Sequence, residues 1–298
     1  MDVCVFGAGS LGTLVGGLLA REHSVTLVGR DPHVNTILED GLRLTGEFDE
    51  TVAPDATTQP PREADLALVT VKAFDTAAAA RALADCDLDC VLSLQNGMGN
   101  EETLASALSE PVLAGTCTYG ARLESPGVVE CTGVGEVALG PRDGGRSELA
   151  DRAGDAFETA GIETTVARDM PRRLWEKLAV NAAINATTAL ARVPNGELLD
   201  GPASVVAREA ARETAVVARE ADVALETGAA VDAAMDVAAA TAANTSSMQQ
   251  DVIAGKRTEI DAINGYVVAQ ADERVPVNET LTGLVRAWEE GNGLGDTG

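Results

Sequence analysis

Hydrophobic residues in the first half of the chain gather in short continuous runs, a pattern typical of strands buried on both faces of a parallel sheet. The runs at residues 3–6 and 25–28 enclose a Gly-rich turn and a helical pattern that extends to about Arg21. This order of strand, turn, helix and strand predicts a βαβ unit. Further strands are expected at residues 66–71, 91–94 and 112–118, and helices at residues 77–84, 101–108 and 147–160.

The pattern changes twice towards the C-terminus. Between residues 127 and 140 the chain is punctuated by Gly, and the runs at residues 128–129 and 137–139 predict a hairpin that closes the sheet. From residue 169 onwards nearly every segment is rich in Ala and helical in period. We therefore predict an α/β fold, with an N-terminal Rossmann-type dinucleotide-binding domain at residues 1–168 and an all-α C-terminal domain at residues 169–298.

The chain is strongly acidic, with 47 Asp plus Glu against 22 Lys plus Arg and a formal net charge of -25. Because a polyanion would be repelled, we expect no nucleic acid partner. Only Lys72, Lys177 and Lys256 are lysines, and this scarcity together with the acidic excess resembles proteins of extreme halophiles. An ordinary acidic cytosolic protein is the alternative, although it leaves the scarcity of lysine unexplained. The halophilic interpretation predicts a fold that concentrated salt stabilises, because screening weakens the repulsion between carboxylates.

The five cysteines include no CxxC pair and lie mostly in apolar segments, which is typical of core thiols in a reducing compartment. No stretch reaches the roughly 20 apolar residues of a membrane span, and residues 1–6 lack the charged start of a signal peptide. Two histidines leave little for a His-based metal site. We expect a cytoplasmic protein with no metal and no membrane partner.

A GxGxxG motif follows the first strand and opens the first helix, the context in which it binds the pyrophosphate of a dinucleotide. The first Gly allows a tight turn, the second lets the backbone approach the pyrophosphate, and the third lets helix and strand pack closely. A purely structural turn is the alternative. The cofactor-binding candidates are Gly7, Ala8, Gly9, Ser10, Leu11 and Gly12.

The second strand ends where NAD-binding folds carry an acidic residue that binds the ribose. Here Asp31 precedes Pro32, a sequence typical of a helix N-cap followed by Pro at the first helical position. Arg30 is then left to bind the 2′-phosphate of NADP as a permanently charged donor. We favour NADP over NAD; the alternative is that Arg30 is a solvated loop residue.

Two further polar segments follow strands, at the edge where ligands bind in this topology. The first contains Lys72, one of the few lysines, and the second contains Asn96-Gly97. A plain turn dipeptide is the alternative for Asn96-Gly97.

One helical segment carries polar residues at a spacing of four, namely Lys177, Asn181 and Asn185. At about 100° per residue they form one stripe of a helix whose neighbouring positions are apolar. Because an unpaired buried amide costs about 1 to 3 kcal/mol, the stripe needs partners, and a ligand would supply them. Hydrogen bonds to a neighbouring helix are the alternative.

Near the C-terminus, Ser246 with Gln249 or Ser247 with Gln250 has the spacing of a capping box. By itself Glu259 is typical of a solvated helix carboxylate. Neither segment alone indicates a function.

Taken together, seven segments resemble the ketopantoate reductase (2-dehydropantoate 2-reductase) family in their order and spacing: GAGSLG, VKAF, QNGMG, WEKLAVNAAIN, PNGEL, NTSSMQQD and TEIDAINGY. The resemblance extends from residue 1 to about Trp288. It implies that 2-dehydropantoate is reduced to (R)-pantoate with NADPH, on the route to pantothenate and coenzyme A.

The resemblance also implies roles for individual residues. Lys177 matches the family's catalytic lysine, and Glu259 matches an acidic residue close to the nicotinamide and the reacting centre. Ala121 matches a backbone cofactor contact, after a loop that is one residue longer, and no role is attached to Gln95. The implied substrate-binding residues are Asn96, Asn181, Asn185, Asn195 and Ser247, of which Asn96 also contacts the cofactor.

Two other functions remain open from the sequence. A reductase of another branched 2-oxo acid would share this skeleton and would also bind a small molecule. A non-catalytic NADP-sensing regulator would have no need of Lys177 and Glu259 together. The sequence leaves the oligomeric state open, with a homodimer as one alternative.

Overall fold

The computed structural model describes residues 1–295, and its contacts divide the chain into two compact units. The first comprises Met1–Gln95 and Asn100–Met170; the second comprises Asn96–Gly99 and the described part of Pro171–Gly298. The division falls two residues after the boundary predicted at residue 168. It also assigns the loop Asn96–Gly99 to the second unit, which the sequence did not indicate.

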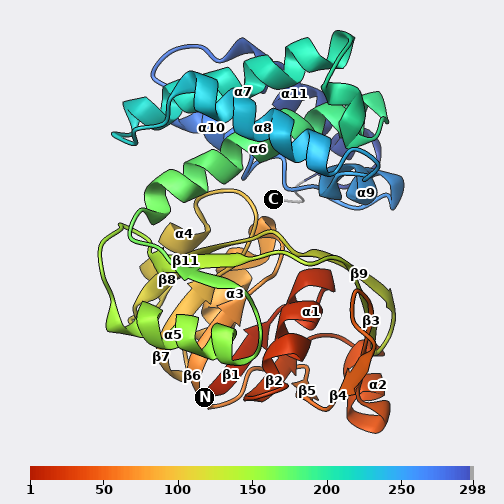
Figure 1. Cartoon of the computed structure of the whole chain (residues 1–298), viewed down its shortest axis with the longest axis vertical. Helices are drawn as coiled ribbons and strands as arrows, with labels where there is room; N and C mark the ends of the chain where they lie inside the picture. Colours follow the sequence, from red (N-terminus) through yellow and green to blue (C-terminus); the bar gives the residue numbers. More distant parts are fainter. Residues whose placement is uncertain (296–298) are drawn as a thin grey trace. The chain divides into compact units, whose positions relative to one another are not determined.

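An eight-stranded sheet forms the centre of the first unit, in the order β12-β11-β8-β7-β6-β1-β2-β5 (Figure 1). All neighbouring pairs are parallel except β11 with β8. The chain continues to one side of β1 through β2 and returns to the other side through β6, which makes β1 and β6 the switch point of a Rossmann-type sheet. The strands are β1 (Asp2–Phe6), β2 (Ser24–Val28), β5 (Asp55–Thr57), β6 (Glu63–Val69), β7 (Asp87–Ser93), β8 (Val112–Cys117), β11 (Val137–Pro141) and β12 (Thr164–Val166).

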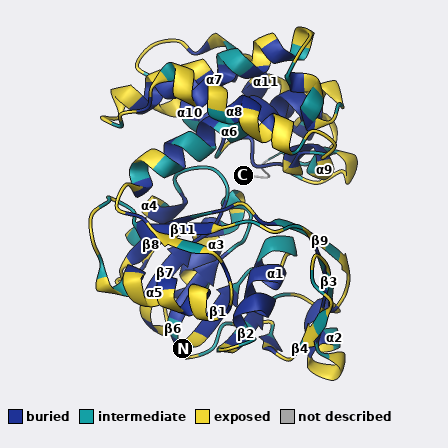
Figure 2. Cartoon of the chain, viewed as in Figure 1, coloured by how far each residue is buried: buried dark blue, intermediate teal, exposed yellow. Residues whose placement is uncertain are grey.

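Helices cover both faces of this sheet because its strands are apolar on both sides. Val3 and Val5 of β1 pack in one core with α1 and α5, while Cys4 packs in another core with α3 and α4. Figure 2 shows buried residues along the strands and exposed residues on α5. The helices are α1 (Ser10–Leu19), α2 (His33–Asp40), α3 (Thr76–Leu83), α4 (Asn100–Ala107) and α5 (Glu148–Thr159), with a short 3-10 helix η1 (Ala73–Asp75).

A second sheet in the first unit was not predicted. It has the order β4-β3-β10-β9, with bounds β3 (Leu42–Gly46), β4 (Glu50–Val52), β9 (Gly120–Ser125) and β10 (Val128–Gly133). The hairpin predicted between residues 127 and 140 is therefore wrong. Its first strand, β10, pairs with β9 and β3, whereas its second strand, β11, pairs with β8 and β12 in the large sheet.

The second unit is helical, so the predicted fold class is confirmed. Its helices are α6 (Met170–Ala191, beginning at the last residue of the first unit), α7 (Pro202–Glu220), α8 (Thr227–Ala240), α9 (Ser247–Ile253), α10 (Asn264–Gln270) and α11 (Pro276–Gly291), with a 3-10 helix η2 (Asn195–Leu198). Alanines such as Ala179, Ala210 and Ala234 are fully buried, and their small side chains let the helices approach closely. Among residues 1–295, no helix is both long and apolar enough to cross a membrane.

A neutral histidine joins α2 to α1 and to the second sheet. The N–H of Gly127 donates to Nδ1 of His33 (3.0 Å), so that nitrogen carries no proton. The opposite nitrogen, Nε2, therefore carries the proton and donates to Oγ1 of Thr13 (3.1 Å). Burial lowers the pKa of His33, because the charged imidazolium is poorly solvated there.

The depressed pKa predicts that His33 destabilises the fold in mild acid. The unfolded chain takes up a proton as the pH falls through about 6.5, whereas the folded chain resists until a lower pH. Stability contributed by neutral His33 is therefore present above that pH and lost below it. Thermal melting between pH 8 and pH 5 in concentrated KCl should show a smaller loss for His33→Gln, whose amide can accept and donate in the same places. Equal losses in the two proteins would contradict this assignment.

Candidate active site

The predicted cofactor-binding segments meet at one edge of the large sheet. Phe6, the last residue of β1, is in register with Val28 of β2 and with Val69 of β6, and Val69 is in register with Ser93 of β7. The segments that follow these strands therefore leave the sheet at the same level. They carry Gly7–Gly12, Arg30, Lys72 and Gln95, and a ligand of this fold binds at that edge.

A side chain would be disruptive at two of the three motif glycines, Gly7 and Gly12, and would meet no described atom at Gly9. Gly7 has a φ of +115°, and a Cβ there would lie 2.8 Å from the backbone of Val71. A Cβ on Gly12 would collide with the carbonyl of Gly7 and with Oγ1 of Thr70. At Gly9 a Cβ would meet no described atom within 4 Å, so the turn is open on that side. The first amides of α1 follow directly, and such amides have no partner within a helix. This cradle fits a dinucleotide pyrophosphate.

Arg30 is exposed, and its guanidinium makes no hydrogen bond or ion pair with any of residues 1–295. The predicted capping role of Asp31 is wrong. Pro32 is the N-cap of α2, and no side chain caps that end. The backbone therefore places both Arg30 and Asp31 in the loop between β2 and α2.

Gln95 fixes the segment that carries Lys72, a role the sequence did not reveal. The side chain of Gln95 is 5% exposed, and its Nε2 donates to the carbonyl of Val71 (3.0 Å) and to Oγ1 of Thr76 (2.7 Å). Lys72 lies between these two residues, as the N-cap of η1. Val71 lies 24 positions before Gln95 in the sequence, so no local pattern predicts this hydrogen bond.

Ala121 lies in β9 of the second sheet, paired with Cys131 of β10. The N–H of Leu123, two residues further along β9, donates to Oγ of Ser10 in the Gly-rich motif (3.1 Å). Strand β9 is thereby attached to the start of α1, and Ala121 belongs to the same unit as the Gly-rich motif, Arg30 and Lys72.

All the proposed substrate-binding and catalytic residues belong to the second unit. Lys177 and Asn181 on α6 are half-buried, and Asn185 is 5% exposed. The side chains of Asn181 and Asn185 form no hydrogen bond with residues 1–295, so the interhelical bonds considered as an alternative are not observed. The amide of Asn185 nevertheless keeps some contact with solvent, because neither of its polar atoms is fully enclosed. A buried amide of this kind is suited to a ligand.

Asn195 and the serines lie on elements attached to α6. Ser246 caps α9 by accepting from the N–H of Gln249 (3.2 Å), and its hydroxyl contacts that of Thr188 on α6 (2.7 Å). Of the two capping serines considered, Ser246 is therefore the one that caps α9, and Ser247 is the exposed first residue of that helix. Asn195 begins η2, where its backbone N–H donates to the carbonyl of Asn244 (3.0 Å).

The amide of Asn195 has a defined orientation. Its Nδ2 donates to Oγ1 of Thr241 (2.9 Å), and that hydroxyl donates its proton to the carbonyl of Val237 (2.6 Å). Oδ1 of Asn195 is left enclosed and without a partner among the described residues. An unsatisfied acceptor of this kind costs free energy, which a hydroxyl donor would recover.

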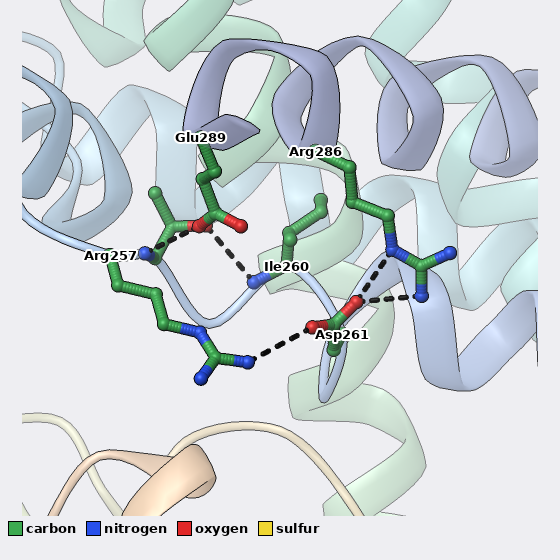
Figure 3. A network of polar contacts seen from close by, with 6 residues as sticks. Arg257, Ile260, Asp261, Arg286 and Glu289 are labelled. Carbon is green, nitrogen blue, oxygen red and sulfur yellow. Dashed lines mark hydrogen bonds and ion pairs between the residues drawn. The ribbon is translucent and has the colours of Figure 1, made fainter. Parts of the chain in front are cut away.

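Glu259 lies on a tight turn between α9 and α10 and is 6% exposed. Its carbonyl accepts from the N–H groups of Ala262 and Ile263, both at 3.1 Å. Figure 3 shows how the rest of the turn is held. On the solvent side of the turn, Asp261 forms ion pairs with Arg257 and with Arg286. On its buried side, Glu289 accepts from the N–H of Thr258, the residue before Glu259.

The loop with Asn96 is attached to this turn. The N–H of Met98 donates to the carbonyl of Ala262 (2.9 Å), and a Cβ on Gly97 would lie 2.6 Å from the same oxygen. Close approach of the two backbones therefore requires Gly97. It places Asn96 in the same unit as Lys177 and Glu259, as the substrate-binding role implied by the resemblance requires.

The fold and these side chains define a class: a two-unit protein with a dinucleotide-type sheet and a helical unit that carries a Lys–Asn stripe. Comparisons with known proteins agree. The model of the ketopantoate reductase PanE/ApbA family matches residues 3–144, and the model of its C-terminal domain matches residues 169–289. The chain belongs to the ketopantoate reductase family.

Relatives and solved structures match nearly the whole chain. The 2-dehydropantoate 2-reductase of Halobacterium salinarum is 44% identical over 304 residues, covering 96% of this chain and 98% of the relative. A PanE/ApbA family ketopantoate reductase from Ralstonia eutropha has a TM-score of 0.89 and 35% identity, covering 98% and 100% of the two chains. A D-mandelate dehydrogenase in complex with NADH has a TM-score of 0.88 and 25% identity, covering 98% and 99%.

The contact between Gly97 and Ala262 predicts unequal costs for two substitutions in one loop. Gly97 and Gly99 have similar φ angles of +80° and +86°, so the left-handed backbone makes alanine less stable by about 1 to 2 kcal/mol at either position. A Cβ on Gly99 would meet only the ring of Tyr266, at 3.6 Å, whereas one on Gly97 overlaps the backbone of Ala262. We expect Gly97→Ala to lower the free energy of unfolding by about 1 to 3 kcal/mol more than Gly99→Ala. Urea unfolding in concentrated KCl measures the difference, and equal losses would argue against the contact.

Proposed function

We propose that this chain reduces 2-dehydropantoate (ketopantoate) to (R)-pantoate with NADPH, and so supplies pantothenate and coenzyme A synthesis. The observation that carries the proposal is the polar stripe on α6. Asn181 and Asn185 have no side-chain partners among residues 1–295, although they lie on a helix buried among alanines. The near full-length similarity to 2-dehydropantoate 2-reductases supports the same reaction.

The first unit would hold the cofactor. Gly7–Gly12 would bind the pyrophosphate, Lys72 and Ala121 would make further contacts, and Asn96 and Glu259 would face the nicotinamide end. Arg30 has no protein partner among the described residues and is free to bind a 2′-phosphate, which favours NADPH over the NADH that the D-mandelate dehydrogenase binds. When bound, the cofactor supplies a hydride to C2 of the oxo acid.

Lys177 is the proposed proton donor. Negative charge develops on the carbonyl oxygen as C2 is reduced, and an ammonium at that position stabilises the charge before it transfers a proton from Nζ to the oxygen. The products are the alcohol and a neutral amine, which is reprotonated from solvent. The carboxylate of Glu259 would help to keep Lys177 charged or orient the reacting group.

Four side chains on α6, η2 and α9 would hold the substrate: Asn181, Asn185, Asn195 and Ser247. With Asn96, they offer amide N–H groups to a carboxylate and oxygens to a hydroxyl. Correct placement of the carbonyl is itself a large part of such catalysis.

A reductase of another branched 2-oxo acid is the second candidate function, and the likeness to a D-mandelate dehydrogenase supports it. Such an enzyme would retain Lys177 and would not need a hydroxyl on its substrate. Comparing kcat/KM for ketopantoate with that for 2-oxoisovalerate, which lacks the hydroxyl, distinguishes the two. Cofactor binding without turnover of either acid would instead indicate the non-catalytic regulator.

We further propose a cytoplasmic, salt-adapted protein, with a homodimer as one possible assembly. The five cysteines are free thiols, and burial raises the pKa of Cys4 to about 12 and of Cys90 to about 11, so both stay protonated. The similarity to a Halobacterium protein supports the salt adaptation. No cluster of three or more metal-ligating side chains occurs within residues 1–295.

Replacing Lys177 tests the mechanism. Lys177→Ala should lower kcat for ketopantoate by about 10²- to 10⁴-fold, because a positioned acid is lost, while the Kd of NADPH changes little. Lys256→Ala is the matched control, since Lys256 is exposed after α9 and should retain full activity. Steady-state and single-turnover kinetics in concentrated KCl measure both variants. A folded Lys177→Ala protein with near wild-type kcat would overturn the assignment.

Replacing Arg30 tests the choice of cofactor. A charge-assisted bond to the 2′-phosphate contributes about 1.5 to 3 kcal/mol, so Arg30→Ala should raise the KM for NADPH about 10- to 100-fold and leave that for NADH nearly unchanged. Arg146→Ala removes one positive charge from another exposed loop of the same unit and serves as the control. An unaltered ratio of the two KM values, or a wild-type preference for NADH, would mean that Arg30 is only a solvated loop residue.

A further inference from the structure

A buried carboxylate on α11 holds the residue that precedes Glu259. Glu289 is 3% exposed, and its Oε1 accepts both from the backbone N–H and from Oγ1 of Thr258, each at 2.7 Å. Oγ1 of Thr258 in turn accepts from the N–H of Ile260 (3.2 Å). As Figure 3 shows, these contacts connect the carboxylate to the residues on either side of Glu259.

Glu289 has no cationic partner among residues 1–295, although burying a carboxylate is costly. Its Oε1 accepts from the two donors of Thr258, which are short and charge-assisted, whereas Oε2 has no partner among the described residues and is not fully enclosed. A buried charge is weak evidence for stability, because an apolar side chain of similar size often does as well. The geometry that Glu289 imposes on the Glu259 turn gives a different reason for a carboxylate here.

We propose that Glu289 is a positioning residue for the reduction. By holding Thr258 at two atoms, it fixes the backbone from which the carboxylate of Glu259 extends. The inference rests on the proposed function only in assigning Glu259 to the reacting centre. In this role Glu289 itself contacts neither substrate nor cofactor.

The remaining contacts of the turn transmit this restraint. The N–H of Gly265 donates to the carbonyl of Ile260 (2.9 Å), and the carbonyl of Ala262 accepts from Met98 in the Asn96 loop (2.9 Å). On the outer side, Arg286 and Asp261 form an ion pair in which both side chains are about half exposed, a kind of pair that contributes little. The inner contact with Glu289 is therefore the stronger restraint.

Two substitutions at Glu289 separate geometry from charge. Glu289→Gln keeps an Oε1 that can accept both donors, so we expect kcat for ketopantoate within about 3-fold of wild type. Glu289→Ala releases Thr258, and a displacement of about 1 Å at a reacting group lowers kcat about 10- to 100-fold. The Kd of NADPH should change by less than about 3-fold in either variant, because most of the proposed cofactor contacts belong to the Gly-rich cradle and its neighbours in the other unit.

The decisive measurement repeats Glu289→Ala in a Glu259→Ala background. If Glu289 acts through Glu259, its removal there should lower kcat by less than about 2-fold, so the two losses are not additive. Equal factors in both backgrounds would show that Glu289 has only a general structural role and would overturn the proposal. An unchanged kcat in the folded Glu289→Ala single variant would overturn it as well.

Two further variants keep the proposal testable if Glu289→Ala does not fold. Thr258→Val removes the hydroxyl donor and should lower kcat, whereas Thr258→Ser retains both donors and should restore it; equal activities would contradict the proposal. Arg286→Ala, on the same helix and the same turn, is the matched control and should retain wild-type kcat. If Glu259→Ala alone leaves kcat unchanged, the role proposed for Glu259 in the reaction is wrong. That result differs from equal effects of Glu289→Ala in both backgrounds, which would contradict only the role of Glu289.

Discussion

The need to pair every buried polar group shapes the helical unit. Its alanine-rich helices approach so closely that a side-chain amide or carboxylate inside must find a partner in the protein or lose free energy. Glu213 is a clear case: its carboxylate accepts from the N–H groups of Val277 and Asn278 at the start of α11 and from Nδ2 of Asn278. Asn278 then accepts from Asn264, which also donates to the carbonyl of Ala182 on α6. One face of α6 is thereby fixed by a continuous polar network.

The stripe on α6 departs from this rule, because the side chains of Asn181 and Asn185 have no partner among the described residues. Ala182 lies one residue after Asn181, so the network from Glu213 holds the backbone of the same helical turn whose side chain has no partner among the described residues. A rigid backbone with unpaired side chains is preorganised for a ligand, because the free energy lost in leaving amides unpaired is recovered on binding. Isolated orphan atoms such as Oε1 of Gln249 show that an unpaired group alone does not define a site. We propose that the periodic stripe, with Lys177 one turn earlier, does.

Local patterns predicted much of this structure, and long-range contacts account for what they missed. The strands at residues 3–6 and 25–28 were evident because continuous apolar runs mark strands buried on both faces, and the stripe on α6 followed from helical spacing. The strands β4 and β5 have only three residues each, too few for a period, and β10 pairs with β3 some 85 positions away. Gln95 and Glu289 were missed for the same reason. Their partners lie 19 to 31 positions distant, and nothing in the neighbouring sequence distinguishes either residue from an ordinary polar one.

The loop Asn96–Gly99 begins where the chain passes from the first unit to the second. Gln95, the residue before it, is bonded within the first unit to the Lys72 segment, whereas Met98 is bonded to Ala262 in the second. Asn96 therefore belongs to the unit that carries Glu259. Gln95, the residue before it, belongs to the unit that carries Lys72. Gly97 adopts a positive φ, which other residues rarely do, and its lack of a side chain lets its backbone approach that of Ala262 in the same unit.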